Sequence, residues 1–512
     1  MKTIVDIFEW CVFIYGSLML VIYAVLTVLS LRNVLVFNRK NRHVDYTKLL
    51  NSPLAPGISI IAPAYNEGLT ILSNVRSLMT LSYPKFEVVI VNDGSTDDTL
   101  QKLIDEFSLV EVDFAYHERI KTRPVKRILK SVDMAYDKLL VIDKENGKSK
   151  ADASNAGVNA AAYDYFLCTD VDCIIEKDTL LRMIKPFMDE DLGTIKEVGL
   201  TFADSNYKAP SEKNMQVIAT GATLRLANSC DVDEGVIVRA RPPRQILPRF
   251  QEMEYIRAFV LGKMGWSLIN CVSNVSGGLG LFDKEVAIKA GGYDGRSFAE
   301  DMDIVTRMSK YMLDNRLKYA VRYIPTSQCW TEGPSTLKIL SRQRTRWGRG
   351  LFEVMMSHRR MIFNPRYKKE GLVILPYNLF FEFLAPVIEF TGILFYIYMI
   401  ASGQVNWPNA VVLFAFVYLY SVMITTLAIT WDQIVHRHYN TWLEVIGLAL
   451  MAFLEPFFYH PLIVFFALRG YFFHITGKKS AWGNMQRKGF AQQKKEDPLA
   501  AAKLTTSNPS RP

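Results

Sequence analysis

The sequence predicts an α/β domain built on a parallel sheet and flanked by membrane helices. Between residues 57 and 338, short apolar runs alternate with helical patterns, and long apolar stretches lie before and after this block. Strands that are apolar throughout are typical of parallel sheets covered on both faces, and alternating strands and helices indicate an open α/β fold. The composition agrees, because 50% of the residues are hydrophobic while 22% are charged, as expected for a soluble block joined to membrane helices.

The first apolar stretch covers residues 10–31 and contains no charged residue. About 20 such residues span a bilayer, and this stretch is too long for a signal peptide and lacks a small-residue cleavage site. Arg32, Arg39 and Lys40 follow it, so the positive-inside rule places the next residues in the cytoplasm. The net charge of +9 gathers beside the apolar segments, which favours membrane anchoring over nucleic-acid binding.

The clearest apolar runs of the central block end in polar or acidic residues. In chain order they read ISIIAPA, FEVVIVND, KLLVID and YFLCTD. Ligands of open α/β sheets bind outside the carboxyl ends of the strands. The acidic residues at these ends therefore mark the edge of the sheet where we expect the functional site.

After residue 364 the chain is apolar again, with candidate membrane segments at 372–401, 409–430 and 441–475. The last segment carries Pro456 and Pro461 and is longer than one span needs, so we predict a helical hairpin there. A hairpin returns the lysine-rich tail to the cytoplasm, as the positive-inside rule requires.

These patterns divide the chain into four parts, although one segment allows two interpretations. Glu382 and Glu389 fall at membrane depth, where charges usually mark a pathway or a buried pair; alternatively, the first half of that segment is an amphipathic interfacial helix. The predicted parts are a transmembrane helix and linker (1–55), a cytoplasmic α/β domain (56–345), interfacial and transmembrane helices (346–480), and a polar, disordered tail (481–512).

The first candidate site elements follow the first two strands. Pro63, Tyr65 and Glu67 belong to the turn APAYNE, which suits a nucleoside pocket. Asp93 ends the next run and is followed by Gly94, which allows a sharp turn. Its carboxylate could accept a hydrogen bond from a base N–H, or it could be a simple turn residue. Asp97 is better explained as a helix N-cap.

A pair of acids indicates a metal site. Asp170 and Asp172 are one residue apart at the end of a buried strand, and on an extended chain their side chains point to the same side. Carboxylate oxygens suit Mg²⁺ or Mn²⁺, and such a metal can bridge a diphosphate. Lys150 opens a predicted helix and could contact the phosphates, or it could belong to a solvated turn.

The glycines of SGGLG and the acids that follow them form another element. Gly277 and Gly278 would let the backbone approach a sugar closely. Asp301 is our candidate general base, which would take the proton of an acceptor hydroxyl. The alternative is that Glu300 and Asp301 are helix-start acids favoured by the helix dipole.

The sequence QRTRW places Gln343, Arg346 and Trp347 together. Arginine binds phosphate through paired hydrogen bonds, and Trp347 could stack on a sugar face. The alternative is a basic and aromatic belt at the membrane surface.

In this order, the motifs APAYNE, VNDGSTDDT, TDVD, SGGLG, AED and QRTRW resemble those of family 2 inverting glycosyltransferases. The chain looks like the membrane branch that includes poly-N-acetylglucosamine synthase, hyaluronan synthase and the cellulose synthase catalytic subunit. The resemblance covers residues 57–350 and implies a GT-A (nucleotide-diphospho-sugar transferase) fold, a UDP-sugar donor, and inversion to a β-linkage. Asn92 and Ala299 depart from the motifs, which commonly carry Asp and Thr there.

The resemblance also implies residue roles. Asp93 resembles the uracil-binding acid, and Asp170 and Asp172 resemble the DxD pair, with Asp172 the closer metal ligand. Asp301 resembles the catalytic base. Acceptor or pyrophosphate contacts are implied for the following set: Gly277, Gly278, Glu300, Trp330, Gln343, Arg346 and Trp347.

The sequence leaves more than one function open. We expect a processive polysaccharide synthase in a bacterial inner membrane, with its catalytic domain in the cytoplasm. It would use a UDP-sugar donor and a carbohydrate or lipid acceptor, and lie among membrane lipids. An export or accessory subunit is a possible further partner, and the sequence leaves open whether one is required. The alternatives are an enzyme that makes a single transfer to a membrane lipid and a catalytically silent nucleotide sensor. The intact acids argue against the sensor.

Overall fold

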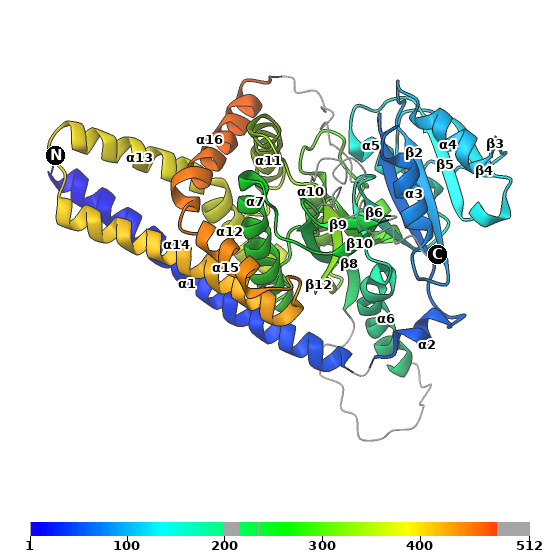
Figure 1. The fold of residues 1–512 in the computed structure, drawn as a ribbon, viewed down its shortest axis with the longest axis horizontal. Helices are drawn as coiled ribbons and strands as arrows, with labels where there is room; N and C mark the ends of the chain where they lie inside the picture. Colours follow the sequence, from blue (N-terminus) through cyan, green and yellow to red (C-terminus); the bar gives the residue numbers. More distant parts are fainter. Residues whose placement is uncertain (1, 43, 198–214, 234, 479–512) are drawn as a thin grey trace, which may run out of the picture.

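The computed structural model describes residues 2–42, 44–197, 215–233 and 235–478. The predicted polar tail, 481–512, lies outside these residues. The described chain forms a twisted sheet covered by helices, next to an elongated group of apolar helices (Figure 1). Both predicted parts are therefore present, and the predicted fold class is confirmed.

The four apolar runs form parallel neighbours in the middle of the sheet. β1 (Ile58–Ala64) pairs in parallel with β2 (Phe86–Asn92) and β6 (Tyr165–Thr169), and β2 pairs in parallel with β5 (Leu139–Lys144). The complete order is β3-β4-β5-β2-β1-β6-β11-β8-β12-β7, with antiparallel pairs toward both edges. The remaining strands are β3 (Leu109–Glu111), β4 (Val125–Ser131), β7 (Ile174–Ile175), β8 (Gln216–Leu226), β11 (Leu279–Asp283) and β12 (Tyr319–Thr331), with a separate pair β9 (Asp231–Asp233) and β10 (Val236–Arg239).

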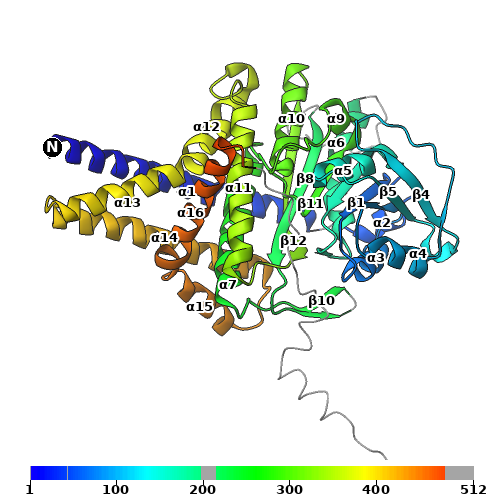
Figure 2. The ribbon, with the colours of Figure 1, turned by 90° about the horizontal axis from the view of Figure 1, so that it is seen from above.

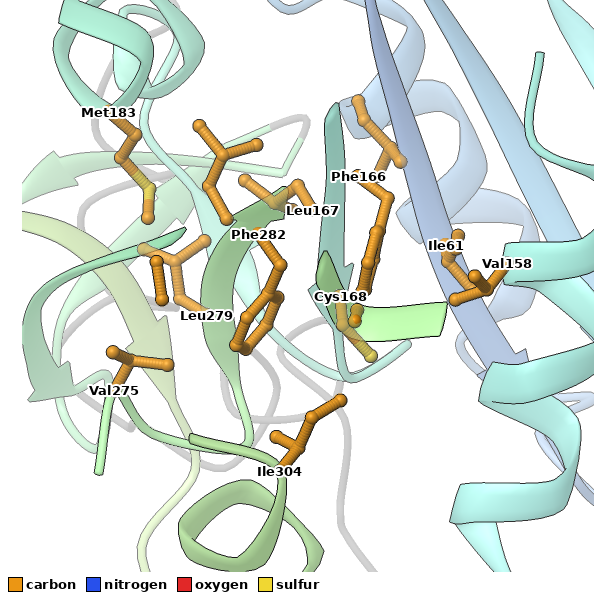
Figure 3. Close-up of a cluster of buried hydrophobic side chains, with 14 of the residues drawn as sticks. Ile61, Val158, Phe166, Leu167, Cys168, Met183, Val275, Leu279, Phe282 and Ile304 are labelled. Carbon is orange, nitrogen blue, oxygen red and sulfur yellow. The ribbon is translucent and has the colours of Figure 1, made fainter. Parts of the chain in front are cut away.

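Helices cover both faces of the sheet. The described helices before the apolar group are α2 (Tyr46–Leu50), α3 (Ile71–Met79), α4 (Thr99–Phe107), α5 (Lys150–Ala160), α6 (Thr179–Glu197), α7 (Ile246–Ile256), α8 (Met264–Leu268), α9 (Lys284–Lys289) and α10 (Glu300–Asp314). Figure 3 shows part of the core that they enclose: the rings of Phe166 on β6 and Phe282 on β11 stack with their centroids 5.2 Å apart. Burial of these apolar side chains stabilises the sheet and fixes where its strands end.

Helix α5 packs very closely on the sheet through Gly157. A Cβ at this position would lie 2.4 Å from Cγ2 of Ile61, which is fully buried on β1. This close approach sets the height of α5 above the sheet, and with it the position of Lys150 at the first turn of the helix.

Replacing Gly157 by alanine is expected to lower the free energy of unfolding by about 1–3 kcal/mol, because the new methyl group overpacks the core. Helix propensity alone predicts the opposite, since alanine is favoured over glycine in a helix by about 1 kcal/mol. Denaturant unfolding in detergent measures the sign. Gly447→Ala is the matched control, because a Cβ there has nothing within 4 Å. A stabilised Gly157→Ala protein would contradict the packing argument.

Three helices among the described residues are long and apolar enough to cross a membrane. They lie within the ranges Ile7–Asn41, Glu370–Ala401 and Trp407–His436. α1 (Lys2–Asn41), α13 (Ala385–Ala401) and α14 (Trp407–His436) run side by side away from the sheet (Figures 1 and 2). Ring contacts join them, as between Phe8 and Phe395, whose centroids are 4.1 Å apart. Glu370–Ala401 also contains the short turns η4 (Glu370–Ile374), α12 (Leu375–Tyr377) and η5 (Asn378–Phe383).

The predicted helical hairpin at 441–475 is wrong. The segment forms α15 (Trp442–Met451) and α16 (Glu455–Ile475), which are bent by 60° at the break and make one broken span or a re-entrant loop. α15 has only 10 residues, about 15 Å of helix, which is half the thickness of the hydrocarbon layer. Pro456 lies in the first turn of α16, and Pro461 lies inside the helix without reversing the chain.

Helix α11 (Leu337–Ser357) packs against α16, and two glycines bring the backbones of these helices close together. A Cβ on Gly348 would lie 2.6 Å from the carbonyl oxygen of Ala467, and a Cβ on Gly470 would lie 2.4 Å from that of Thr345. Paired small residues of this kind let two helix backbones touch. α11 is continuous across the predicted domain boundary at 345, so that division of the chain stays a prediction.

A buried ionic cluster joins the apolar helices to the sheet. Arg225 on β8 forms ion pairs with Glu252 on α7, at 2.9 Å, and with Asp432 on α14. The Tyr439 hydroxyl donates to Glu252 Oε1 at 2.9 Å, and all of these side chains are buried. A buried charge is tolerated only when it is paired, so the sheet and α14 depend on each other.

Candidate active site

A cavity of about 440 Å³ opens at the carboxyl ends of β1 and β6, on the edge of the sheet that the sequence predicts. Its walls come from the turns after these strands, the loop before β11, and the helices α7, α10 and α11. Most of the predicted site residues line it: Pro63, Tyr65, Glu67, Lys150, Asp170, Asp172, Gly277, Gly278, Glu300, Asp301, Gln343, Arg346 and Trp347.

The turn after β1 is fastened to the turn after β2. Asn66 adopts a positive φ of 56°, and its side-chain oxygen accepts the N–H of Thr96 at 2.8 Å. Asp97 accepts the N–H groups of Thr99 at 3.0 Å and of Gly68 at 3.2 Å. The N-cap of α4 is Asp98 and not the predicted Asp97. Asp97 lies one residue earlier, and its hydrogen bonds hold the two turns together.

Asp93 does not line the cavity. Its Oδ1 accepts hydrogen bonds from Lys144 Nζ at 2.7 Å and from the N–H of Gly147 at 2.9 Å. Lys144 is fully buried at the end of β5 and also pairs with Asp152 Oδ2 at 2.5 Å. Asp93 therefore anchors the loop that leads into α5. Sequence reasoning missed Lys144, although a lysine that ends a buried strand beside Asp93 was a signal for it.

Lys150, which is buried, contacts the partly exposed Asp170 on the cavity wall. Ser149 caps α5 by accepting the N–H of Asp152 at 3.2 Å, so Lys150 starts the helix and reaches inward. Its Nζ lies 2.5 Å from Asp170 Oδ1 and donates to the carbonyl oxygen of Gly277 at 2.7 Å. Burial opposes the charged form, but the nearby carboxylate of Asp170 outweighs it and raises the pKa of Lys150.

Asp170 and Asp172 meet through a turn. β6 ends at Thr169, and the N–H of Cys173 donates to the carbonyl oxygen of Asp170 at 3.1 Å. We expected strand alternation to align the two carboxylates; the turn aligns them instead, because the ladder of β6 stops one residue earlier. One ligand atom each from Asp170, Asp172 and Cys173 lies within 4.8 Å of the others. Two carboxylates so close together fit a divalent cation such as Mg²⁺ or Mn²⁺.

The acids of α10 face the glycine loop. A Cβ on Gly277 would lie 3.6 Å from Asp301 Oδ2, and one on Gly278 would lie 3.7 Å from Asp170 Oδ2. Glu300 and Asp301 begin α10, and the N–H of Met302 donates to Asp301 Oδ1 at 2.9 Å. Burial and the neighbouring charge of Asp301 raise the pKa of Glu300, against the opposing effect of Lys150. The absence of side chains at Gly277 and Gly278 thus keeps space open between two pairs of acids. These pairs are Asp170 with Asp172, and Glu300 with Asp301.

Helix α11 brings Gln343, Arg346 and Trp347 to the cavity. Gln343 accepts a hydrogen bond from Gln251 Nε2 at 3.0 Å. The guanidinium of Arg344 lies 4.3 Å from the centre of the Trp347 ring, which holds the indole in place. All three predicted residues therefore line the cavity.

Trp330 lies outside the cavity wall. Its ring is buried among Ile174, Ala227 and Cys230, and Nε1 donates to Glu176 Oε1 at 2.7 Å. The next residue, Thr331, lines the cavity. Neighbouring residues of a strand point to opposite faces, which explains why only one of the two reaches the site.

Sequence reasoning missed the wall formed by α7 and the π-helical segment η2 (Arg257–Lys263). It contributes Glu254, Tyr255, Ala258, Phe259 and Lys263 to the cavity. The two terminal guanidinium nitrogens of Arg344 donate to the two carboxylate oxygens of Glu254, at 2.5 and 2.7 Å. The sequence carries no clear signal for this wall, because Glu254 and Lys263 stand in a stretch that also holds Arg249, Glu252 and Arg257.

Comparison with known proteins gives consistent matches. A model described as glycosyltransferase like family 2 matches residues 56–350, and one described as glycosyl transferase family group 2 matches residues 250–454. A poly-beta-1,6-N-acetyl-D-glucosamine synthase of Staphylococcus epidermidis is 26% identical over 331 residues, 65% of this chain and 62% of that protein. One from Staphylococcus aureus strain COL is 26% identical over 301 residues, 59% of this chain and 56% of that protein. The matched region thus spans less than two thirds of these relatives.

Solved structures give weaker likenesses. The mannosyltransferase PcManGT from Pyrobaculum calidifontis, in complex with GDP-Man and Mn2+, has a TM-score of 0.42 and 15% identity, and the match covers 90% of this chain and 99% of that one. Residues 1–349 of S. aureus TarS give a TM-score of 0.35 and 13% identity, with 78% of this chain and 91% of that one covered.

Proposed function

This chain belongs to glycosyltransferase family 2, and from that membership we propose that it transfers N-acetylglucosamine from a UDP-sugar donor, with inversion, to a growing β-linked polysaccharide. The relatives named as poly-beta-1,6-N-acetyl-D-glucosamine synthases support the sugar and the polymer. The observation that carries the proposal is the cavity itself, where Asp170 and Asp172 face Asp301 across the Gly277–Gly278 loop.

The donor side is formed by the turns after β1 and β6. Lys150 and Arg346 bring positive charge to the cavity, where they would bind the diphosphate and stabilise it as it leaves. Asp170 and Asp172 would hold the divalent metal, which supplies further charge to the leaving diphosphate. Pro63, Tyr65 and Glu67 line the adjoining wall as the proposed nucleoside contacts.

Asp93 is proposed to bind the uracil base of the donor. Both of its hydrogen bonds from described residues end on Oδ1, so Oδ2 is available to accept the N–H of uracil. Lys144 and Gly147 would fix the direction of that acceptor.

The acceptor side lies toward α10 and α11. Asp301 would accept the proton of the attacking hydroxyl as that oxygen forms its bond to the anomeric carbon. Trp347 offers an aromatic face for a sugar ring, Gln343 offers polar contacts, and Glu300 sits beside the base. Trp330 would affect acceptor binding only indirectly, by fixing the position of its neighbour Thr331, which lines the cavity.

The proposed setting is a bacterial inner membrane. The basic end of α1, with Arg39 and Lys40 in its last turn, would lie in the cytoplasm together with the sheet. The proposed domain division is 1–55, 56–345 and 346–480, with α11 running across the boundary at 345. Membrane lipids, and in the cell an export or accessory subunit, are the proposed further partners.

The test is a measurement of UDP release in mild detergent from a panel of UDP-sugars with Mg²⁺ or Mn²⁺, with the sugar product sized in the same samples. We expect release with UDP-N-acetylglucosamine and a long, heterogeneous product. One sugar on a co-purified lipid would replace polymer synthesis by a single transfer. Binding of UDP without release from any donor would overturn the enzymatic proposal in favour of a sensor.

Replacing Asp172 by asparagine is expected to weaken Mn²⁺ binding by about 10- to 100-fold, because a charged oxygen ligand is lost. Electron paramagnetic resonance of Mn²⁺ titrated into the protein with UDP measures this directly. Asp178→Asn, at a partly exposed acid paired with Arg182 outside the cavity, is the control. Equal Mn²⁺ binding by Asp172→Asn and the unchanged protein would remove Asp172 from the metal site.

A further inference from the structure

Lys263 is a cavity residue for which the proposed reaction has no role so far. It ends η2, between α7 and α8, on the same wall as Phe259 and Tyr255. π-helical turns inside α-helices are frequent at functional sites. This turn keeps Lys263 on the cavity face, while Val260 and Leu261 pack into a separate apolar cluster that includes residues of α14.

The ammonium group of Lys263 lies among aromatic rings. Nζ is 4.6 Å from the ring centre of Phe259 and 5.5 Å from that of Tyr323. Its polar neighbour is Asn274 Oδ1, at 3.4 Å, and within the described ranges no carboxylate forms an ion pair with it. An ammonium has three donors, so Lys263 keeps hydrogen-bonding capacity for something that enters the cavity.

Asn274 connects Lys263 to the opposite wall. Its Oδ1 also accepts the N–H of Ser276 at 2.5 Å, and the next residue, Gly277, faces Asp301. Lys263 and Asp301 therefore flank one loop and border the same space. A hydroxyl held between them would meet a proton acceptor on one side and a cation on the other.

We infer that Lys263 positions the acceptor: its ammonium donates a hydrogen bond to an oxygen of the acceptor sugar and holds the attacking hydroxyl beside the Asp301 carboxylate. The inference rests on the proposed function and deepens it. The aromatic rings of Phe259 and Tyr323 hold the ammonium in place by cation–π contact.

The protonation state of Lys263 can be changed by pH in an experiment. Burial lowers the pKa of Lys263 to about 8, against the opposing effect of Asp301. Of the other charged groups on the packed elements, Glu254 on α7 pairs with Arg344, and Arg257 on η2 pairs with Glu455. α1 presents Ser30 and Asn33 to this segment, which are uncharged. Lys263 is thus protonated below about pH 8 and neutral above it.

Lys263→Met is expected to lower kcat/KM for the acceptor at pH 7 by about 10- to 100-fold, as for a lost hydrogen bond from a charged donor. UDP binding should be unchanged. The unchanged protein should lose acceptor kcat/KM above about pH 8, and Lys263→Met should lack this alkaline limb. Lys263→Arg should restore activity and move the limb to higher pH, because arginine stays charged. Lys289→Met, at an exposed position that ends α9, is the control.

A Lys263→Met protein with the same rate and the same alkaline limb as the unchanged protein would overturn the inference. So would an unchanged protein without any alkaline limb, a result that needs no variant to fold. Failure of the proposed function looks different, because the unchanged protein would then release no UDP from any donor. Loss of UDP binding in Lys263→Met would assign the residue to the donor side and equally contradict the inference.

Discussion

Asp301→Asn is expected to abolish sugar transfer almost completely, with a loss of about 10³-fold in kcat at saturating donor. General-base catalysis contributes about 10²- to 10⁴-fold, and the amide cannot accept the proton of the attacking hydroxyl. The substitution keeps the shape of the side chain and the start of α10. UDP release and product formation give the rate, and calorimetric titration with UDP should show unchanged affinity.

Asp314→Asn is the matched control for this prediction. Asp314 ends the same helix and pairs with Lys310 and Arg366 away from the cavity. The control should keep its full transfer rate. If Asp301→Asn transferred sugar as fast as the control, another group would have to be the base, and Glu300 would be the next residue to test.

Gly470→Leu is expected to lower the free energy of unfolding by about 3 kcal/mol and to cost about 100-fold in the activity of the protein that still folds. A Cβ at Gly470 meets the carbonyl oxygen of Thr345 at 2.4 Å and the N–H nitrogen of Arg349 at 2.6 Å. Backbone atoms cannot rotate away, so α11 must move. The moved turn includes Arg346 and Trp347, and a displacement of about 1 Å at such groups reduces the rate by about 10²-fold.

Gly447→Leu is the control for this effect, since a Cβ there meets nothing within 4 Å. Thermal unfolding in detergent and UDP release should both distinguish the two variants. If Gly470→Leu behaved like Gly447→Leu, the close contact between α11 and α16 would not be required in the folded protein.

The central strands and the cavity edge could be predicted because they depend on local pattern. ISIIAPA coincides with β1, and YFLCTD with β6 and Asp170 directly after it. When an apolar run stops at an acidic residue, the sequence predicts both where the strand ends and which polar group lies at that end. The ordered motifs then brought together residues from β1, α10 and α11 that no periodicity relates.

The parts that could not be predicted depend on contacts distant in sequence. The position of the Asp93 side chain depends on its ion pair with Lys144, which comes from a different strand. The orientation of Trp330 depends on how β12 pairs with β7 and β8. In the same way, no sequence motif includes Lys263, because only the fold brings it into one cavity with Asp301.

The ion pair between Arg225 and Asp432 has a consequence for biosynthesis. The two residues lie about 200 positions apart, so at about 5–20 residues per second the ribosome adds Asp432 on the order of 10–40 s after Arg225. Until α14 is made, Arg225 on β8 lacks a partner that it has in the finished protein. This part of the sheet therefore completes its buried ion pairs only after α14 reaches its final position, and a chain that ends before α14 would leave the ribosome without the Arg225–Asp432 pair.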